Sequence, residues 1–346
     1  MVPPDEKENT RFHAALDRPV DRATIHRLFT AGHLSAADRD ATLKWMLPPQ
    51  EWWGWVNRLL LFLGAALLLA GIVFFFAFNW ARMSPFAKFA LIEGALLSCV
   101  VAAWIAGLNR ITGQVLLLGA GLLVGVLLAV YGQVYQTGAD AYELFVGWSL
   151  LILGWVIVAR FGALWLMWLS LINVSIMTYW SQVAEPNGRA TPETMFMLLA
   201  LINGAALVAR EYGAAQNLSW LAPRWLRWVL LGSILIYLTI SGTIFIAGAK
   251  SLFETSALSL MLLMATLAAS YRFFRFRDRD LLSLTMCALS ACAVVLTAIG
   301  RGLFKTVGWD GAGAFLVFGL MVIGVFSAVA FWLRAVSAAM EGETDA

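Results

Sequence analysis

Charged residues are scarce in this sequence, at 13% of its 346 residues, whereas apolar residues make up 61%. Soluble globular proteins carry about 25% charged residues and roughly 45–50% apolar residues. A soluble fold of this composition would have too little polar surface to face water. The shortage of charge therefore excludes a soluble globular protein and predicts an all-α fold, a polytopic transmembrane helical bundle.

Histidine is missing from the apolar part of the chain, because all three histidines lie within the first 33 residues. That part therefore has no histidine to act as a general base or to bind a metal ion. The sequence also lacks the Gly-x-Ser-x-Gly, His-Glu-x-x-His and phosphate-binding Gly-Lys-Ser/Thr motifs. We expect no enzyme, no cofactor and no metal ion. The net charge of +3 gives no reason to expect a nucleic acid partner.

The three cysteines, Cys99, Cys287 and Cys292, all lie inside apolar stretches. Their spacing fits neither a metal site nor an even-numbered disulfide framework. Free cysteines in such surroundings behave as small apolar side chains. We expect all three in the core.

Long apolar runs dominate what is present. A helix needs roughly 20 mainly apolar residues to cross a bilayer core about 30 Å thick. The sequence predicts ten such windows, with nine or eleven as the alternatives because three windows are short. The windows are 59–80, 86–108, 111–130, 144–159, 161–180, 194–209, 225–247, 256–271, 281–299 and 312–333.

Basic residues predict the orientation of these windows. With the N-terminus in the cytoplasm, 18 of the 24 lysine and arginine residues lie on the cytoplasmic side and 6 on the other side. Short cytoplasmic loops collect lysine and arginine, so both termini are expected in the cytoplasm. Arg110, Arg160 and Arg210 stand 50 residues apart at the cytoplasmic ends of windows. A repeat of helical hairpins would explain this spacing, but so would the charge bias alone, which we favour.

The polar N-terminal segment is expected to form a cytoplasmic helix pair. Asp21 would cap a first helix that Gly32 ends, and Ser35 with Asp38 resembles a capping box for a second. The predicted domains are a helical module at 1–55, a transmembrane bundle at 56–334 and a disordered acidic tail at 335–346.

A cluster of aromatic, amide and acidic residues without lysine or arginine follows the third window. On an extracytoplasmic loop it would receive a partner protein or a cationic or sugar-like ligand; the alternative is an interfacial tyrosine belt. The candidate partner or ligand face comprises Asn79, Trp80, Tyr131, Gln133, Tyr135, Asp140, Tyr142, Glu143 and Asp310.

Polar residues inside the windows are few, and ionisable groups in hydrocarbon are costly. Glu93 would be a proton or cation site, or else a carboxylate near the outer interface paired with Lys88 or Arg82. Interhelical hydrogen bonds are the favoured role for the amides and hydroxyls. The candidate intramembrane polar residues are Glu93, Gln114, Asn173, Asn203 and Tyr237.

Two further patterns carry predictions. Gly121-x-x-x-Gly125 would let another helix approach closely, although this motif does not by itself indicate dimerisation. The densest basic run would contact anionic lipid headgroups or simply fix a cytoplasmic loop. Its candidate headgroup contacts are Arg272, Arg275, Arg277 and Arg279.

Three motifs resemble a family of bacterial membrane proteins known as domain of unknown function 2157. They are Gly32-His-Leu-Ser-Ala-Ala-Asp38, Gly71-Ile-Val-Phe-Phe-Phe-Ala-Phe-Asn-Trp80, and Tyr131-Gly-Gln-Val-Tyr135 with Gly138-Ala-Asp140. The resemblance covers about residues 20–185 and implies a bacterial inner membrane, with no assigned activity. It also implies, as a partner, a membrane-anchored protein bearing a Gly-Asp-Tyr-x-x-Leu-x-Tyr motif, which this chain lacks.

These observations predict a non-enzymatic inner-membrane protein that contacts the lipid bilayer. It would serve as a subunit or scaffold of a membrane complex, binding a partner through its periplasmic face. A homo-oligomer would be compatible with this role. The alternative is a small-molecule transporter or lipid flippase, which would need a polar cavity near the membrane midplane.

Overall fold

The computed structural model describes residues 22–46, 56–57, 59–60, 63–64, 67, 70–71, 74, 78–188, 191–248, 255–306 and 311–342. The chain divides into an N-terminal unit, Met1–Met83, and a larger unit, Ser84–Ala346, which we call the bundle. Each is described by itself. Half of the predicted window at 59–80 lies outside the described residues, so this span stays a prediction.

The N-terminal unit contains the predicted helix pair, α2 (Arg22–Thr30) and α3 (Ala36–Met46). Gly32 lies between them with a φ of 78°, which glycine adopts without strain. The Ser35 hydroxyl accepts a hydrogen bond from the Asp38 backbone N–H at 3.1 Å and donates one to the Asp38 carboxylate at 2.6 Å. This pair confirms Ser35 as the cap of α3. Asp21 lies outside the described residues.

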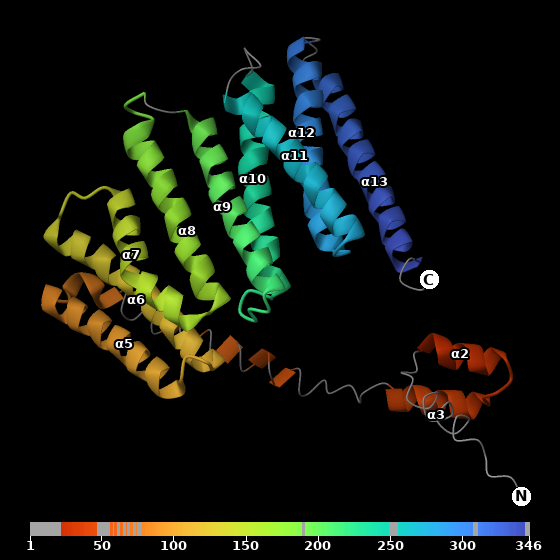
Figure 1. Ribbon diagram of the computed structural model, residues 1–346, viewed down its shortest axis with the longest axis horizontal. Coiled ribbons are helices and arrows are strands. Elements are labelled where there is room, and N and C mark those ends of the chain that lie inside the picture. The colour runs from red at the N-terminus through yellow and green to blue at the C-terminus, as the bar shows by residue number, and fades with distance from the viewer. Residues whose placement is uncertain are drawn as a thin grey trace, which may run out of the picture. The chain divides into compact units, whose positions relative to one another are not determined.

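The bundle is built from helices α5 to α13 (Figure 1). Within the described part of the chain, nine helices are long and apolar enough to cross a membrane, so the multi-pass prediction is confirmed there. The helices are α5 Pro85–Ala106, α6 Ile111–Tyr135, α7 Ala141–Ala159, α8 Gly162–Tyr179, α9 Pro192–Ala215, α10 Arg224–Gly248, α11 Thr255–Phe276, α12 Leu281–Arg301 and α13 Ala312–Gly342. A 3-10 turn, Trp80–Arg82, precedes them, and π turns follow α8 at Trp180–Ala184 and α12 at Gly302–Thr306.

Several predicted boundaries were wrong in the same direction, because polar residues continue the helices beyond the apolar windows. Helix α6 extends to Tyr135 and α7 begins at Ala141, so the predicted loop at Tyr131–Glu143 shrinks to five residues. Helix α13 continues to Gly342, whereas the disordered tail was predicted from 335. The added stretch is rich in alanine, which has the highest helix propensity.

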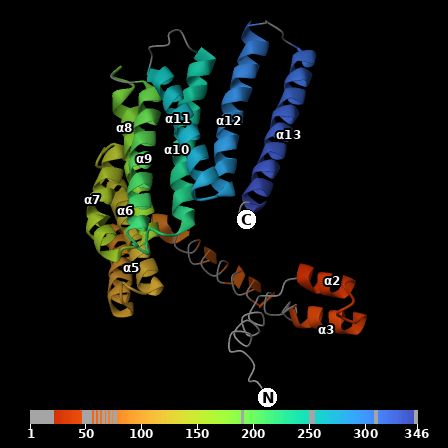
Figure 2. The same ribbon diagram turned by 45° about the vertical axis from the view of Figure 1, so that its right-hand side comes forward.

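The apolar core of the bundle consists of two separate clusters. One includes Leu117 of α6, Ile152 of α7 and Leu164 of α8. The other includes Leu235 of α10 and Leu284 of α12, among others. Helices α9 to α13 build this second cluster, and in both views α13 lies at an edge of the bundle beside α12 (Figure 2).

Short connections make consecutive helices antiparallel, so alternate connections lie at the same end of the bundle. We call the end with the α6–α7 and α8–α9 connections the tyrosine end. The opposite end, with the α5–α6, α7–α8, α9–α10 and α11–α12 connections, is the arginine end. The candidate sites lie at these two ends and between them.

Candidate functional site

Tyrosine rings and carboxylates gather where α6 passes into α7. We call Tyr131, Tyr135, Asp140, Tyr142 and Glu143 the tyrosine patch. The rings of Tyr131 and Tyr135, one helical turn apart, lie 4.7 Å from each other between centroids. They are 50% and 61% exposed. Asp140 and Glu143 are also exposed. The patch therefore presents aromatic faces and negative charge together.

Neighbouring helices hold the patch in place. The ring of Phe89 from α5 stacks on Tyr135 with 6.1 Å between centroids. The ring of Tyr179 from α8 packs edge-on against Tyr142 at 5.2 Å. The Tyr142 backbone N–H donates to the Gln182 side-chain oxygen at 3.4 Å. Phe89, Tyr179 and Gln182 were not among the predicted residues of this face, because they come from other parts of the chain.

Other members of the predicted face have different outcomes. Gln133 is exposed on α6 between the two tyrosines. Asn79 and Trp80 belong to the N-terminal unit, and their part in the face stays a prediction. Asp310 lies outside the described residues.

The buried amides of Asn173 and Asn203 join α8 to α9. Asn203 Nδ2 donates to Asn173 Oδ1 at 2.8 Å, and Asn173 Nδ2 donates in return at 3.3 Å. Asn203 Nδ2 also donates to the Leu199 carbonyl at 2.8 Å. Asn203 is only 1% exposed. Each amide therefore satisfies the other, in the interhelical role favoured from the sequence.

Replacing Asn203 with leucine is expected to destabilise the bundle by about 1–3 kcal/mol, because a buried amide of Asn173 loses its partner. Unfolding of the purified protein in mixed detergent micelles would measure the change. The double substitution Asn173→Leu with Asn203→Leu removes both amides and is expected to recover much of the loss. A single variant as stable as the wild type would contradict the pairing.

The remaining intramembrane candidates lie apart from one another. Glu93 is exposed on α5, which argues against the site in the bundle interior. Gln114 Nε2 donates to the Ala159 carbonyl at 3.4 Å, linking α6 to α7. Tyr237 of α10 stacks on Phe196 of α9 with 6.4 Å between ring centroids. These contacts tie neighbouring helices together.

An ionic network at the arginine end was not anticipated. Arg227 of α10 donates two hydrogen bonds to the carboxylate of Glu211 of α9, at 2.7 and 2.8 Å. It also forms an ion pair with Asp278, which follows α11. Arg210 pairs with Glu211 at 2.7 Å and donates to the carbonyls of Ala222 and Pro223. Both arginines are buried. The network therefore joins α9, α10 and the α11–α12 connection to one another through ion pairs.

Asp280 forms a second set of hydrogen bonds at the arginine end, between α10 and α12. Its carboxylate accepts hydrogen bonds from the Trp228 indole at 2.8 Å and the Ser283 hydroxyl at 2.8 Å, and caps α12 through the backbone of Leu282 and Ser283. Burial disfavours its ionised form, but these hydrogen bonds outweigh burial and lower the pKa of the Asp280 carboxyl. The cap is therefore ionised at neutral pH.

The predicted headgroup contacts divide into two groups. Arg272, Arg277 and Arg279 are exposed. Arg272 and Arg277 line a surface pocket at the end of α11. Arg275 is buried and lies over the Phe276 ring at 5.4 Å, so its prediction as a headgroup contact was wrong. It follows the buried Phe274 on the inward side of α11.

Two glycines of α6, Gly121 and Gly125, contact side chains of other helices instead of a second helix backbone. A Cβ added to Gly125 would lie 2.4 Å from the ring of Trp148. The Trp148 indole N–H donates to the Gly121 carbonyl at 2.7 Å. The Gly121-x-x-x-Gly125 motif therefore leaves space for the Trp148 side chain of α7 to pack against α6.

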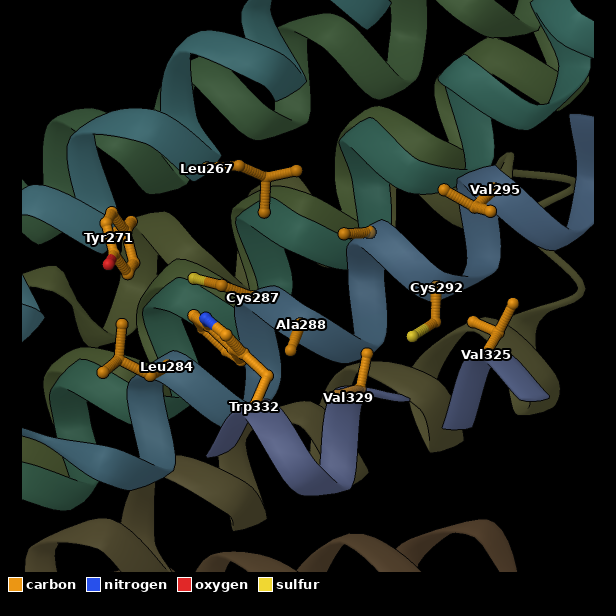
Figure 3. Close-up of a pocket in the computed structure, with 11 residues that line it drawn as sticks. Leu267, Tyr271, Leu284, Cys287, Ala288, Cys292, Val295, Val325, Val329 and Trp332 are labelled. Atoms are coloured by element: carbon orange, nitrogen blue, oxygen red, sulfur yellow. The ribbon is translucent and has the colours of Figure 1, made fainter. Parts of the chain in front are cut away.

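An apolar pocket of about 310 Å³ lies among α11, α12 and α13. In Figure 3, Tyr271 of α11 and Trp332 of α13 flank the side chain of Cys287. Cys287 and Cys292 are both buried, as predicted, whereas Cys99 is half-buried. The lining is almost entirely apolar, so the pocket suits hydrocarbon.

Residues 27–165 match the family described as predicted membrane protein (DUF2157), which confirms the resemblance seen in the sequence. The chain matches no curated protein and no solved structure. The matched segment includes the end of α2 and all of α3 in the N-terminal unit and, in the bundle, the tyrosine patch. Over residues 27–165, this chain is similar to the predicted membrane proteins that share domain of unknown function 2157.

Proposed function

We propose that this multi-pass protein is a non-enzymatic subunit or scaffold of a membrane complex and binds a partner protein through the tyrosine patch. The observation that carries the proposal is the exposed pair of Tyr131 and Tyr135, whose rings lie 4.7 Å apart between centroids, beside exposed carboxylates. Tyrosine is enriched at protein interfaces and among the residues that dominate binding energy.

The packing of the patch supports this proposal over a plain tyrosine belt. A belt of interfacial rings needs only lipid and water around it. Here Phe89 of α5, Tyr179 of α8 and Gln182 just after α8 contact the tyrosines. Side chains that are already ordered lose less conformational entropy when a partner binds. Asp140 and Glu143 favour a partner that brings basic groups or hydrogen-bond donors.

Charge distribution supports a matching proposal for location. Because 18 basic residues would lie on one side and 6 on the other, we infer that both termini lie in the cytoplasm of a bacterium and the tyrosine patch in the periplasm, at the inner membrane. The membrane-anchored protein with a Gly-Asp-Tyr-x-x-Leu-x-Tyr motif is the candidate partner, and a second copy of this chain is the competing one.

Fewer structural observations support the alternative of a transporter or flippase. Such a protein needs polar groups that face a substrate near the midplane. Asn173 and Asn203 are directed at each other, and Glu93 is exposed on the outside of α5. The interior amides therefore act between helices.

Site-specific photo-crosslinking in living cells tests the partner. A photoreactive residue at Gln133, beside the patch, is expected to give one discrete adduct with a second membrane protein. The matched control is Ile105, which is equally a surface position on a bundle helix but lies at the arginine end. The Gln133 adduct should fall several-fold when Tyr131 and Tyr135 are both replaced with alanine.

Mass spectrometry of the adduct separates the outcomes. A different membrane protein, crosslinked only with the tyrosines intact, supports the proposal. An adduct with a second copy of this chain replaces the partner with a homo-oligomer. Equal labelling from Gln133 and Ile105, or no adduct at Gln133, contradicts a binding role for the patch.

A further inference from the structure

A polar pocket of about 610 Å³ lies at the arginine end, away from the tyrosine patch. Its walls come from the start of α6, the α7–α8 connection and the α9–α10 connection. We call it the arginine-end pocket. Its volume falls within the roughly 300–1,000 Å³ typical of ligand sites. The polar side chains that line it are Asn109, Gln114, Arg160, Asn217 and Ser219.

The positive charge of the pocket lining favours an anionic ligand. Arg160 is the one charged residue among those that line this pocket, and no carboxylate joins it. Arg160 is exposed and makes no ion pair with any residue that the structure describes. Arg210 and Arg227 at the same end, by contrast, form ion pairs with Glu211 and Asp278. The charge of Arg160 is therefore available to a ligand.

The backbone at Arg160 is unusual as well. Its φ of 45° lies in the left-handed region, where a helix normally ends in glycine or asparagine. An arginine there gives up some stability, because its Cβ is crowded in this conformation. Stability alone would favour glycine at this position. A bound anion would offset this cost, because no described carboxylate pairs with Arg160.

The remaining lining supplies neutral donors. Asn109, Asn217 and Ser219 are exposed and carry amide or hydroxyl donors. The residues Ile111 and Gly162, which begin α6 and α8, also line the pocket. The backbone N–H groups at helix starts favour negative charge nearby. These features add to the guanidinium of Arg160, and phosphate oxygens accept from all of them.

The surroundings indicate a lipid. Trp220 and Trp225 line the pocket, and tryptophan gathers at the level of lipid headgroups. Ile111 and Val158 of the same lining are more than 60% exposed and would face acyl chains. A phospholipid has this pairing of a phosphate with hydrocarbon below it. An ethanolamine headgroup would need a carboxylate for its ammonium, which the lining does not offer.

We propose that the arginine-end pocket binds the phosphate of an anionic phospholipid, with Arg160 as its charged contact. The pocket is separate from the tyrosine patch, so this inference stands without the proposed partner. The Arg160 guanidinium would donate to the phosphate, and the exposed amides and hydroxyl would contact the rest of the headgroup.

Native mass spectrometry of the full-length protein tests this with phosphatidylglycerol and phosphatidylethanolamine in separate detergent samples. The wild type is expected to retain phosphatidylglycerol more strongly. Arg160→Gly should weaken this retention about tenfold or more, the effect of losing a hydrogen bond to a charged group. Glycine also suits the left-handed backbone, so this variant should unfold no earlier than the wild type.

Arg334→Ala is the matched control, because Arg334 is an exposed arginine near the end of α13 and outside the pocket lining. It should retain lipid as the wild type does. Equal losses in the two variants, or equal retention of the two lipids, would overturn the proposal.

Glycerol 3-phosphate, added without lipid, tests the other source of the same chemistry. It is expected to bind weakly or not at all, because it lacks acyl chains. If it binds in an Arg160-dependent way while neither lipid is retained, the pocket takes a soluble phosphate and the lipid proposal is wrong.

Discussion

Replacing Arg227 with alanine is expected to destabilise the bundle by about 3–5 kcal/mol, the largest effect of any single substitution considered. Removing one partner of a buried ion pair leaves the other charges uncompensated, at a cost of this size. Arg227 holds Glu211 through two hydrogen bonds and also pairs with Asp278. Its guanidinium also lies 5.6 Å from the Phe274 ring centroid, and this contact would be lost too.

Thermal or detergent-induced unfolding of the purified protein would measure this effect. Arg224→Ala is the matched control, because Arg224 starts the same helix but is exposed and has no ion pair with a described residue. Its stability should stay within about 0.5 kcal/mol of the wild type. If Arg227→Ala and Arg224→Ala unfold at the same temperature or detergent concentration, Arg227 does not stabilise the bundle through the network.

Replacing Gly125 with leucine is expected to cost about 1–3 kcal/mol through overpacking. Even a single Cβ at this position would lie 2.4 Å from the Trp148 ring, so the indole must move. Its hydrogen bond to the Gly121 carbonyl would then be lost or lengthened. Because Trp148 packs against the core of α6, α7 and α8, the loss should appear as lower stability and changed tryptophan fluorescence.

Gly119→Leu serves as the control for Gly125→Leu. Gly119 lies on the same helix, and a Cβ added there meets nothing within 4 Å. Leucine has a higher helix propensity than glycine, so this control should be as stable as the wild type or more so. Equal destabilisation at both positions would show that Trp148 does not depend on the space at Gly125.

The spans were predictable from the sequence because bilayer thickness sets the length of an apolar run, whatever the helices pack against. Helix ends were less predictable. Helix α9 continues through Arg210, Glu211 and Tyr212 because the arginine and glutamate find partners there and remain helical. Composition alone suggested that the helix should stop where charge begins.

Pairing between distant residues was the part that the sequence did not reveal. Arg227 meets Glu211 and Asp278, which are 16 and 51 positions away, only after three helices pack. The available signal was the gathering of charges of both signs at neighbouring helix ends on one predicted side. The tyrosine patch was found because Tyr131, Tyr135 and Tyr142 are close in sequence, whereas Tyr179 is contributed by another helix.

The division of the core into two clusters bears on how the chain is made. Each cluster comes from consecutive helices, α5 to α8 in one and α9 to α13 in the other. Domains generally fold in order during synthesis, N-terminal parts first. Ile152 and Leu164 share their cluster with residues of α5 to α8 alone. The first cluster can therefore begin to assemble once α8 has left the ribosome, before the helices of the second cluster are complete.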